Sequence, residues 1–322
     1  MKVKEDIDAY LEQFYSRDKD WCAGTGSILM GTWQMYEATK DEQYFSWIKN
    51  YLEEVVAEDG SIKGYPSNED VLEGIGGGLI FFRMYDRVNE EKYRKAITYV
   101  MERLRECPRC ACGNFLYGKS EPDESWLVAL YKTQPFYMAY ETTYGKKEKY
   151  NDIINQFENV EKFLYNENRD FSPFGLQMRS LACYLAAFVD TLDHMSFEIY
   201  EQYRVLQDAF KMALQKTLPY QSQESCLFPS RIGAEADAVT ENTLQIDEAG
   251  SAIIGYSILK ACRMGILLKE KYVASGIEII ESLTRNALFS DKGFAEDIEG
   301  IGMFIMACGE YLRMKKEMDE NG

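Results

Sequence analysis

Apolar residues recur along the whole chain at the spacing of helices. They fall three and four residues apart, which is the period of an α-helix that buries a face. The pattern predicts twelve helices, over residues 3–15, 24–38, 42–57, 70–87, 90–107, 124–144, 148–165, 175–192, 197–216, 243–263, 269–286 and 297–318. Long alternating runs of Val, Ile and Thr are absent and only 7 residues are Pro, so we expect an all-α fold.

Two kinds of predicted helix alternate along the chain. The even-numbered ones run apolar on nearly every side, as in 124–136, and several begin with small residues, as in 24–31 and 74–81. The odd-numbered ones are amphipathic and charged, as in 90–107. A helix that is apolar all round belongs in the interior, so the even helices should form an inner layer and the odd ones an outer layer.

An internal repeat supports this arrangement. Residues 35–44 match residues 84–93, and residues 139–150 are a weaker copy. In each copy an inner helix ends, a short polar turn follows and an outer helix starts. Repeats of this length indicate stacked helical hairpins, and six hairpins make an (α/α)6 barrel, with an open solenoid as the alternative. We expect one domain over residues 1–322, because the length and the 46% hydrophobic content supply a large core.

The charge of the chain limits its partners. The net charge of −17 disfavours a duplex nucleic acid and an anionic membrane surface, because both need a basic footprint. Most of the acidity is expected to lie on a solvated surface. An anionic substrate would therefore have to meet a locally placed Arg or Lys.

The ends and the cysteines suggest where the chain works. The N-terminal segment has neither the uninterrupted apolar core nor the cleavage site of a signal peptide, and no apolar run is long enough for a membrane span. We therefore expect a cytoplasmic protein whose eight cysteines are free thiols. Cys107, Cys110 and Cys112 resemble half a zinc site, but no second pair follows, so neither a metal nor another cofactor is predicted.

Two long connections, over residues 108–122 and 216–242, suggest where a site would lie. On a barrel they join an outer helix to the next inner one, so they lie on the rim that carries the inner-helix N-termini. Loops of this length are often functional. The same geometry would gather seven residues at one mouth: Trp21, Glu73, Glu124, Trp126, Arg179, Asp247 and Glu248.

A series of motifs extends over most of the chain. They lie at residues 21–26 with 36–39, 72–79, 113–117, 126–131 with 134–136, 179–184, 247–251 and 300–310. In this order and spacing they resemble glycoside hydrolase families 88 and 105, the unsaturated glucuronyl and rhamnogalacturonyl hydrolases. The resemblance implies an (α/α)6 barrel, in agreement with the helix pattern.

The resemblance also implies a reaction. The substrates would be oligosaccharides that carry the unsaturated uronic acid left by polysaccharide lyases. In these families an aspartic acid protonates the C4=C5 double bond and helps water to attack C5, after which the product rearranges and the glycosidic bond breaks. Such chemistry needs a carboxylic acid whose pKa is raised, a second carboxylate or polar group, aromatic platforms for the sugar and a donor for the uronate.

The chain departs from the family pattern at important positions. The proposed catalytic aspartate corresponds to Val128, which cannot transfer a proton. The other active-site aspartate corresponds to Glu73, and a family histidine corresponds to Tyr117. The single histidine, His194, falls in a predicted turn and does not supply the missing chemistry.

Each charged candidate has a structural alternative. Glu73 starts a glycine-rich helix whose glycines would leave room for a ligand, but an acidic residue is also favoured in any first turn. Asp247 and Glu248 either cap their helix or line the pocket. Arg179 begins an apolar stretch and must pair with a carboxylate or a bound anion. Glu124 either contacts substrate or caps its helix.

The remaining candidates are Trp21, Trp126 and Tyr117, whose rings either stack on sugars or belong to the core. Lys132 lies four residues after Val128, on the same helix face, and either enters the cavity or extends to solvent.

Two functions follow from these residues. The first is a glycoside hydrolase of the unsaturated-uronyl type, in which Glu73 is the catalytic carboxylate, helped by Glu124 or by Asp247 and Glu248. The second is a catalytically inactive relative that binds carbohydrate or acts as a scaffold, which Val128 favours. Epimerase or lyase chemistry would rest on fold analogy alone. The predicted partner is an oligosaccharide, with no nucleic acid and no membrane.

Overall fold

The computed structural model describes residues 2–17, 19–21, 24–66, 71–117, 123–166, 171, 176–232, 245–285 and 297–321. Its contacts divide the chain into two compact units. Unit 1 contains residues 1–105 and 280–322, and unit 2 contains residues 106–279. The expectation of a single domain stays a prediction.

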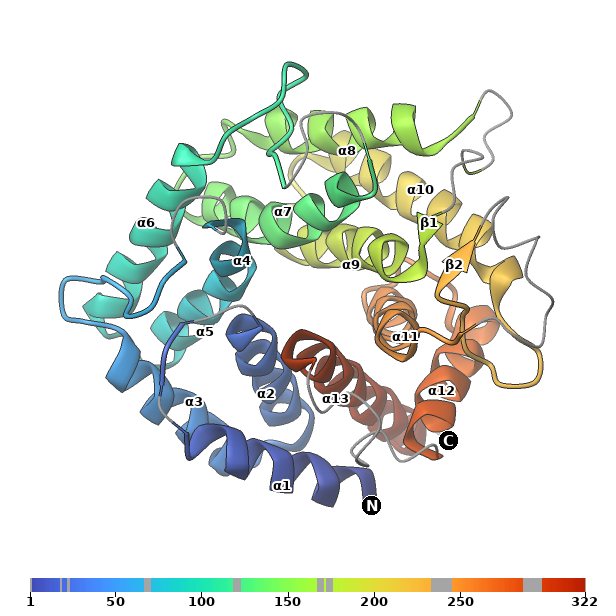
Figure 1. Ribbon diagram of the computed structural model, residues 1–322, viewed down its shortest axis with the longest axis horizontal. Coiled ribbons are helices and arrows are strands. Elements are labelled where there is room, and N and C mark those ends of the chain that lie inside the picture. The colour runs from blue at the N-terminus through green and yellow to red at the C-terminus, as the bar shows by residue number, and fades with distance from the viewer. Residues whose placement is uncertain are drawn as a thin grey trace. The chain divides into compact units, whose positions relative to one another are not determined.

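Unit 1 is built from helices of both ends of the chain. They are α1 (Lys2–Tyr15), α2 (Thr25–Thr39), α3 (Glu42–Val55), α4 (Val71–Ile75), the 3-10 helix η2 (Gly76–Gly78), α5 (Leu79–Val88), α6 (Glu91–Glu106) and α13 (Ile298–Asn321). In Figure 1, α2 lies between α3 and α13 and packs against both. Because α2 is buried on nearly all sides while α3 buries one face, α2 is the interior member of this group.

Glycines let the interior helices of unit 1 approach closely. A Cβ built at Gly26 would lie 2.5 Å from Cα of Gly77, and a Cβ at Gly302 would lie 2.5 Å from the carbonyl carbon of Ser27. Any side chain at these positions would overlap backbone atoms. Glycine is therefore required where α2 crosses η2 and α13.

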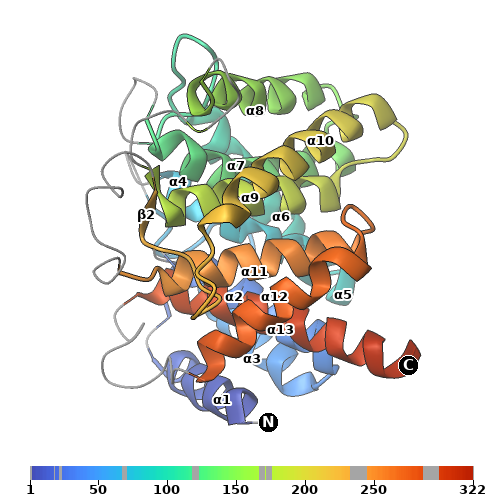
Figure 2. The same cartoon turned by 90° about the vertical axis from the view of Figure 1, so that its right-hand side faces the viewer.

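Unit 2 holds the middle of the chain. Its elements are α7 (Ser125–Thr143), α8 (Tyr150–Leu164), β1 (Leu176–Gln177), α9 (Met178–His194), α10 (Tyr200–Thr217), the 3-10 helix η3 (Leu218–Tyr220), β2 (Arg231–Ile232), α11 (Glu248–Arg263) and most of α12 (Lys269–Arg285). Helix α9 packs against both α7 and α11, and α10 packs along its other side (Figures 1 and 2). The strands β1 and β2 pair antiparallel.

The core of unit 2 is centred on α9 and α11. Every residue over 180–192 of α9 and over 249–262 of α11 is buried. Aromatic rings fill the space between α8 and α9, where the rings of Phe157 and Phe188 stack with their centroids 4.6 Å apart. Helices α8 and α10 bury one face each. Within each unit, then, helices that are apolar all round lie inside and amphipathic ones lie outside, as the sequence predicted.

A buried ionic cluster joins the C-terminal halves of α9 and α11. Lys260 is 4% exposed, and its Nζ lies 2.8 Å from Asp190 Oδ1 and 3.0 Å from Asp193 Oδ2. The hydroxyl of Tyr256 donates to Asp190 at 2.6 Å. Burial alone would raise the pKa of Asp193, but Lys260, His194 and Arg263 outweigh it and hold that pKa well below its usual range.

The all-α prediction is confirmed, and each of the twelve predicted helices has a counterpart among the described residues, with 70–87 appearing as the continuous segment α4–η2–α5. The starts of the tenth and the eighth were wrong. Helix α11 begins at Glu248 rather than at 243, after the non-helical residues 245–247. Residues predicted as the first turn of 175–192 include β1, and α9 begins at Met178, because Leu176 and Gln177 pair with β2 instead.

No helix in the described part of the chain is both long enough and apolar enough to cross a membrane. The cytoplasmic location stays a prediction.

Candidate active site

The N-terminal ends of α7, α9 and α11 lie together in unit 2. The backbone N–H and the Nε2 of Gln177, just before α9, both donate to the carboxylate of Glu124, just before α7, at 2.8 Å each. The next connection runs through the strands, since the N–H of Met178 donates to the carbonyl of Ser230 at 2.9 Å. The N–H of Ser230 in turn donates to the carbonyl of Gln245, before α11, at 2.7 Å. Hydrogen bonds therefore tie the starts of these three helices to one another.

Asp247 caps α11. Its Oδ1 accepts a hydrogen bond from the N–H of Gly250 at 2.7 Å, and its own N–H donates to the carbonyl of Phe228 at 3.0 Å. The hydroxyl of Ser251 accepts from the N–H of Phe228 at 3.0 Å, so the loop before β2 is fixed to the first turn of the helix. Of the two roles predicted for Asp247, the structure shows the cap.

Glu248 follows the cap and has a different environment. It is the first residue of α11 and is half-buried. Burial, and secondly the negative charge of Asp247, raise the pKa of the Glu248 carboxyl. A carboxyl group with a raised pKa holds a proton over more of the neutral range, which is the property that a general acid needs.

Two acidic residues precede α7, and each makes a different contact. Asp123 accepts a hydrogen bond from the N–H of Ser125, the first residue of α7, at 2.8 Å. Glu124 accepts the hydrogen bonds of Gln177 instead, and its side chain is half-buried. Trp126 is 4% exposed, and its indole N–H is buried without a hydrogen-bond partner among the described residues. A buried indole N–H usually finds a hydrogen-bond partner, so Trp126 is an exception among the described residues.

Two further candidates of unit 2 are Arg179 and Tyr117. Arg179 is half-buried in the first turn of α9, two residues after Gln177. Tyr117 is half-buried at the end of the segment that precedes α7. Unit 2 thus brings the predicted residues Glu124, Trp126, Arg179, Asp247 and Glu248 to the same ends of three adjacent helices.

In unit 1, Trp21 is packed by other aromatic rings. It is 1% exposed, and its ring stacks on Phe81 with centroids 5.1 Å apart and on Tyr65 at 6.5 Å. The edge of the ring lies 2.9 Å from where a Cβ of Gly77 would be. These contacts are those of a core residue, and stacking of Trp21 on a sugar stays a prediction.

Glu73 is half-buried in the first turn of α4. Two of the glycines after it do not leave open space. A Cβ at Gly74 would lie 2.6 Å from the ring of Tyr65, and one at Gly77 would lie 2.6 Å from Cα of Gly26. The room that the sequence suggested beside Gly74 and Gly77 is filled by protein, because the glycines serve close packing. The catalytic role of Glu73 stays a prediction.

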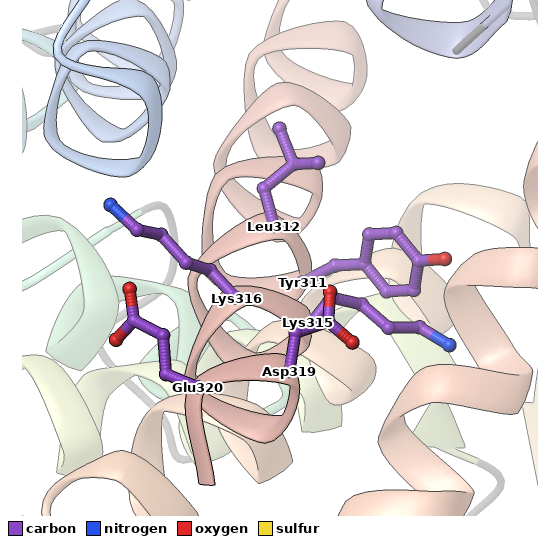
Figure 3. Close-up of a pocket in the computed structure, with 6 residues that line it drawn as sticks. All are labelled: Tyr311, Leu312, Lys315, Lys316, Asp319 and Glu320. Atoms are coloured by element: carbon purple, nitrogen blue, oxygen red, sulfur yellow. The ribbon is translucent and has the colours of Figure 1, made fainter. Parts of the chain in front are cut away.

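The described residues also form a hollow near the end of α13, lined by Tyr311, Leu312, Lys315, Lys316, Asp319 and Glu320. Figure 3 shows that these side chains come from one helix and spread to either side of it. None is a predicted site residue. From Glu299 in the first turn of α13 to Tyr311 the helix rises about 18 Å, so the hollow lies far from the N-terminal end of this helix.

Comparison with known proteins identifies the family. The family described as Glycosyl Hydrolase Family 88 matches residues 2–171, just over half of the chain. The chain belongs to this family. The prediction of a glycoside hydrolase, made from the order of its motifs, is thereby confirmed.

Solved structures agree. A glycoside hydrolase from family 105 of C. acetobutylicum ATCC 824 is 21% identical, with a TM-score of 0.81, and the match covers 97% of this chain and 99% of that one. A structure described as a polysaccharide lyase is 15% identical, with a TM-score of 0.74 and coverage of 98% and 97%. The unsaturated glucuronyl hydrolase of Bacillus sp. GL1 is 13% identical, with a TM-score of 0.63 and coverage of 93% and 88%. Unsaturated glucuronyl hydrolases are α/α barrels, so the predicted fold class is confirmed.

In this member of family 88, position 128 carries no titratable group. Val128 is half-buried in α7. Lys132, one turn later, is 6% exposed, so the alternative that its side chain extends into solvent is wrong. The correspondence of Val128 to the catalytic aspartate of the families stays a prediction.

The sequence did not point to Gln177, whose amide and backbone join two helix starts. It was assigned to the first turn of a predicted helix, and its partner Glu124 is 53 residues away in the chain. Asp297 was also missed. It caps α13 by accepting from the N–H of Gly300 at 2.9 Å, and an acidic residue before a glycine-rich apolar run was the available signal.

Proposed function

We propose that the protein hydrolyses oligosaccharides that carry an unsaturated uronic acid at one end, with Glu248 as the proton donor. Membership of family 88 supports the reaction class. The observation that carries the assignment of the donor is the half-buried Glu248 carboxyl beside Asp247, whose pKa is raised by burial and by that neighbour. A similar structure is described as an unsaturated glucuronyl hydrolase responsible for the degradation of glycosaminoglycan.

The proposed reaction starts on the protonated side chain. The Glu248 carboxyl gives its proton to C4 of the C4=C5 double bond, and a water oxygen adds to C5. The carboxylate left on Glu248 takes the proton lost by that water, so the acid is restored at the end of the step. The hydrated sugar then opens and releases the rest of the oligosaccharide. A catalytic role is also proposed for Glu73, on the resemblance of its motif to the family alone.

The other candidates are proposed to bind the sugar. Arg179, half-buried at the start of α9, is suited to an ion pair with the uronate carboxylate. Glu124 and Asp247 each accept protein hydrogen bonds and keep acceptor capacity for sugar hydroxyls. The rings of Tyr117 and Trp126 are proposed to pack against the substrate, and stacking of Trp21 on a sugar stays a prediction. The substrate is an anionic oligosaccharide, and the proposed scheme uses no metal or other cofactor.

The test follows the conjugated double bond of unsaturated uronyl disaccharides, of both glucuronyl and rhamnogalacturonyl type. The wild-type enzyme should consume this double bond, so its absorbance should disappear. Glu248→Gln and Glu73→Gln should each lower kcat by about 10²–10⁴-fold, the usual effect of losing a general acid or base. The control is Glu201→Gln, an exposed acidic residue in the first turn of outer helix α10, which should leave kcat unchanged.

The second candidate function, a relative that binds carbohydrate without turnover, is favoured by Val128 in α7. Calorimetric titration with the same disaccharides separates the two. Heat of binding with stable absorbance would establish the binding protein and overturn the hydrolase. A rise of absorbance on a saturated polyuronate would instead indicate lyase chemistry, which makes the double bond rather than consuming it.

A further inference from the structure

A short hairpin of unit 2, over residues 107–117, carries two cysteines in its turn. Arg109 and Phe115 face each other in an antiparallel bridge. The carbonyl of Cys110 accepts from the N–H of Gly113 at 3.0 Å, and the N–H of Cys110 donates to the carbonyl of Asn114 at 2.9 Å. Cys110 and Cys112 are thus the first and third residues of a tight turn, and Gly113, with φ of 100°, closes it in the left-handed region.

The turn holds the two thiols against each other. The Sγ atoms of Cys110 and Cys112 lie 2.8 Å apart. Cys110 is half-buried and Cys112 is exposed, so a small reagent reaches the pair from solvent. Cys107, the third cysteine of the segment, is buried.

The thiols have opposite electrostatic environments. Burial would raise the pKa of Cys110, but hydrogen bonds from the Cys112 thiol and from the backbone N–H groups of residues 112–114 outweigh it, so that pKa is lowered. Burial and the same contact raise the pKa of Cys112. Cys110 is therefore the better nucleophile near neutral pH, and Cys112 retains its proton.

The hairpin is fixed to α8, which keeps the pair in place. The guanidinium of Arg109 makes two hydrogen bonds to Asp152, at 2.8 and 2.9 Å, and lies over the ring of Phe115. Asn114 Nδ2 donates to the carbonyl of Gln156 at 2.9 Å. Asn159 Nδ2 donates to the carbonyl of Cys112 at 3.1 Å. A turn anchored at both ends holds its side chains together without a covalent bond.

We propose that Cys110 and Cys112 form a thiol–disulfide exchange site that reacts with small disulfides such as oxidised glutathione. The Cys110 thiolate attacks one sulfur of the reagent, forms a mixed disulfide and releases one thiolate. Cys112 then gives up its proton and attacks the Cys110 sulfur, forming the Cys110–Cys112 disulfide and releasing the second thiolate. The protein loses two electrons and two protons, and the reagent becomes two thiols.

Metal binding is the other use of paired thiols. Among the described side chains no group of three or more His, Cys, Asp or Glu is placed to hold a metal ion. A structural zinc site needs four ligands, so the two thiols of the turn favour disulfide exchange.

The experiment uses the folded wild-type protein, reduced and then exposed to oxidised glutathione at neutral pH. Free thiols are alkylated and the protein is digested with trypsin. Cleavage after Arg109 and Lys119 releases residues 110–119, which contain Cys110 and Cys112 but not Cys107. The expected product is this peptide, unalkylated and lighter by two hydrogens.

Single variants test the order of attack. In Cys112→Ser the disulfide is lost and Cys110 retains glutathione as a mixed disulfide, whereas in Cys110→Ser the disulfide is lost and Cys112 reacts more slowly. The matched control is Cys226→Ser, a half-buried cysteine in another loop of unit 2, which leaves the 110–119 disulfide unchanged. Thermal melting confirms that each variant is folded. The proposal is overturned if residues 110–119 stay fully alkylated, or if Cys107 is found in the disulfide.

Discussion

Replacing Lys260 by Met should destabilise the protein strongly, because it removes the cation that pairs with Asp190 and Asp193 in a buried cluster. Among the described residues, Lys260 Nζ contacts both Asp190 and Asp193, and the Lys260 side chain is 4% exposed. The methionine side chain has a similar length and fills the same space. The perturbation therefore removes the charge and leaves the packing of α9 against α11 largely in place.

The size of the effect follows from the burial. Removing one partner of a buried ion pair typically costs about 3–5 kcal/mol, since the other charge stays buried. The bond from Tyr256 to Asp190 offsets part of this, which favours the lower half of that range. For cooperative unfolding of 322 residues the unfolding entropy is about 0.7 kcal/mol per degree, so a loss of about 4 kcal/mol lowers Tm by about 6 °C.

The assay is urea unfolding at neutral pH, followed by circular dichroism and supported by calorimetry. The matched control is Lys147→Met, which breaks the ion pair of Lys147 with Glu198 in the same unit, where the Glu198 side chain is 77% exposed. An exposed pair of this kind contributes about 0–1 kcal/mol. A loss below about 1 kcal/mol for Lys260→Met, or equal losses for both variants, would refute the reasoning.

The pH dependence gives an independent check on the same cluster. The pKa of Asp193 is depressed in the folded state, so its contribution to stability is present above the unfolded value, near 3.8, and is lost as the pH falls below it. Lys260→Met removes the main cause of the depression. The free energy of unfolding of the variant should therefore depend less on pH in the acid range than that of the wild type.

Three other predictions concern the close glycine contact in unit 1 and the start of α11. Gly77→Ala should cost at least about 1–3 kcal/mol in urea unfolding, because its Cβ would overlap Cα of Gly26. Asp247→Asn keeps the cap but removes a negative neighbour, so the pKa of Glu248 should fall and the alkaline limb of kcat/KM should move to lower pH. Glu248→Gln should be more stable than the wild type at neutral pH. The pKa of Glu248 is raised in the folded state, so the wild type loses stability as the pH rises through that pKa. In acid titrations of unfolding, the difference in unfolding free energy between the two proteins should disappear below pH 4.5.

Much of the helical layout was predictable from the sequence because it depends on local periodicity. The segments around α2, α9 and α11 are apolar on all sides, and burial on all sides is what the structure shows. The two-residue strands were not predictable, since β1 exists only through its pairing with β2, which starts 54 residues after Gln177. Periodicity carries no information about such distant partners.

The candidate site was predictable in part, for the same reason. An acidic residue at the start of an apolar helix is visible in the sequence, and Glu124, Asp247 and Glu248 were placed correctly at helix starts. What each carboxylate does depends on tertiary contacts. Glu124 holds Gln177, and Glu248 is half-buried beside Asp247. The glycines after Glu73 were misinterpreted, because a glycine-rich sequence does not distinguish close helix packing from an open pocket.

The central claim is that Glu248 protonates the sugar double bond, and isotope transfer tests it most directly. The wild type and Glu248→Gln are incubated with an unsaturated uronyl disaccharide in D2O, and the monosaccharide product is analysed by mass spectrometry and NMR. The account predicts that the wild type places deuterium at C4 and that Glu248→Gln forms about 10²–10⁴-fold less of this product. Equal formation of C4-deuterated product by both proteins, or wild-type cleavage with no deuterium at C4, would contradict it.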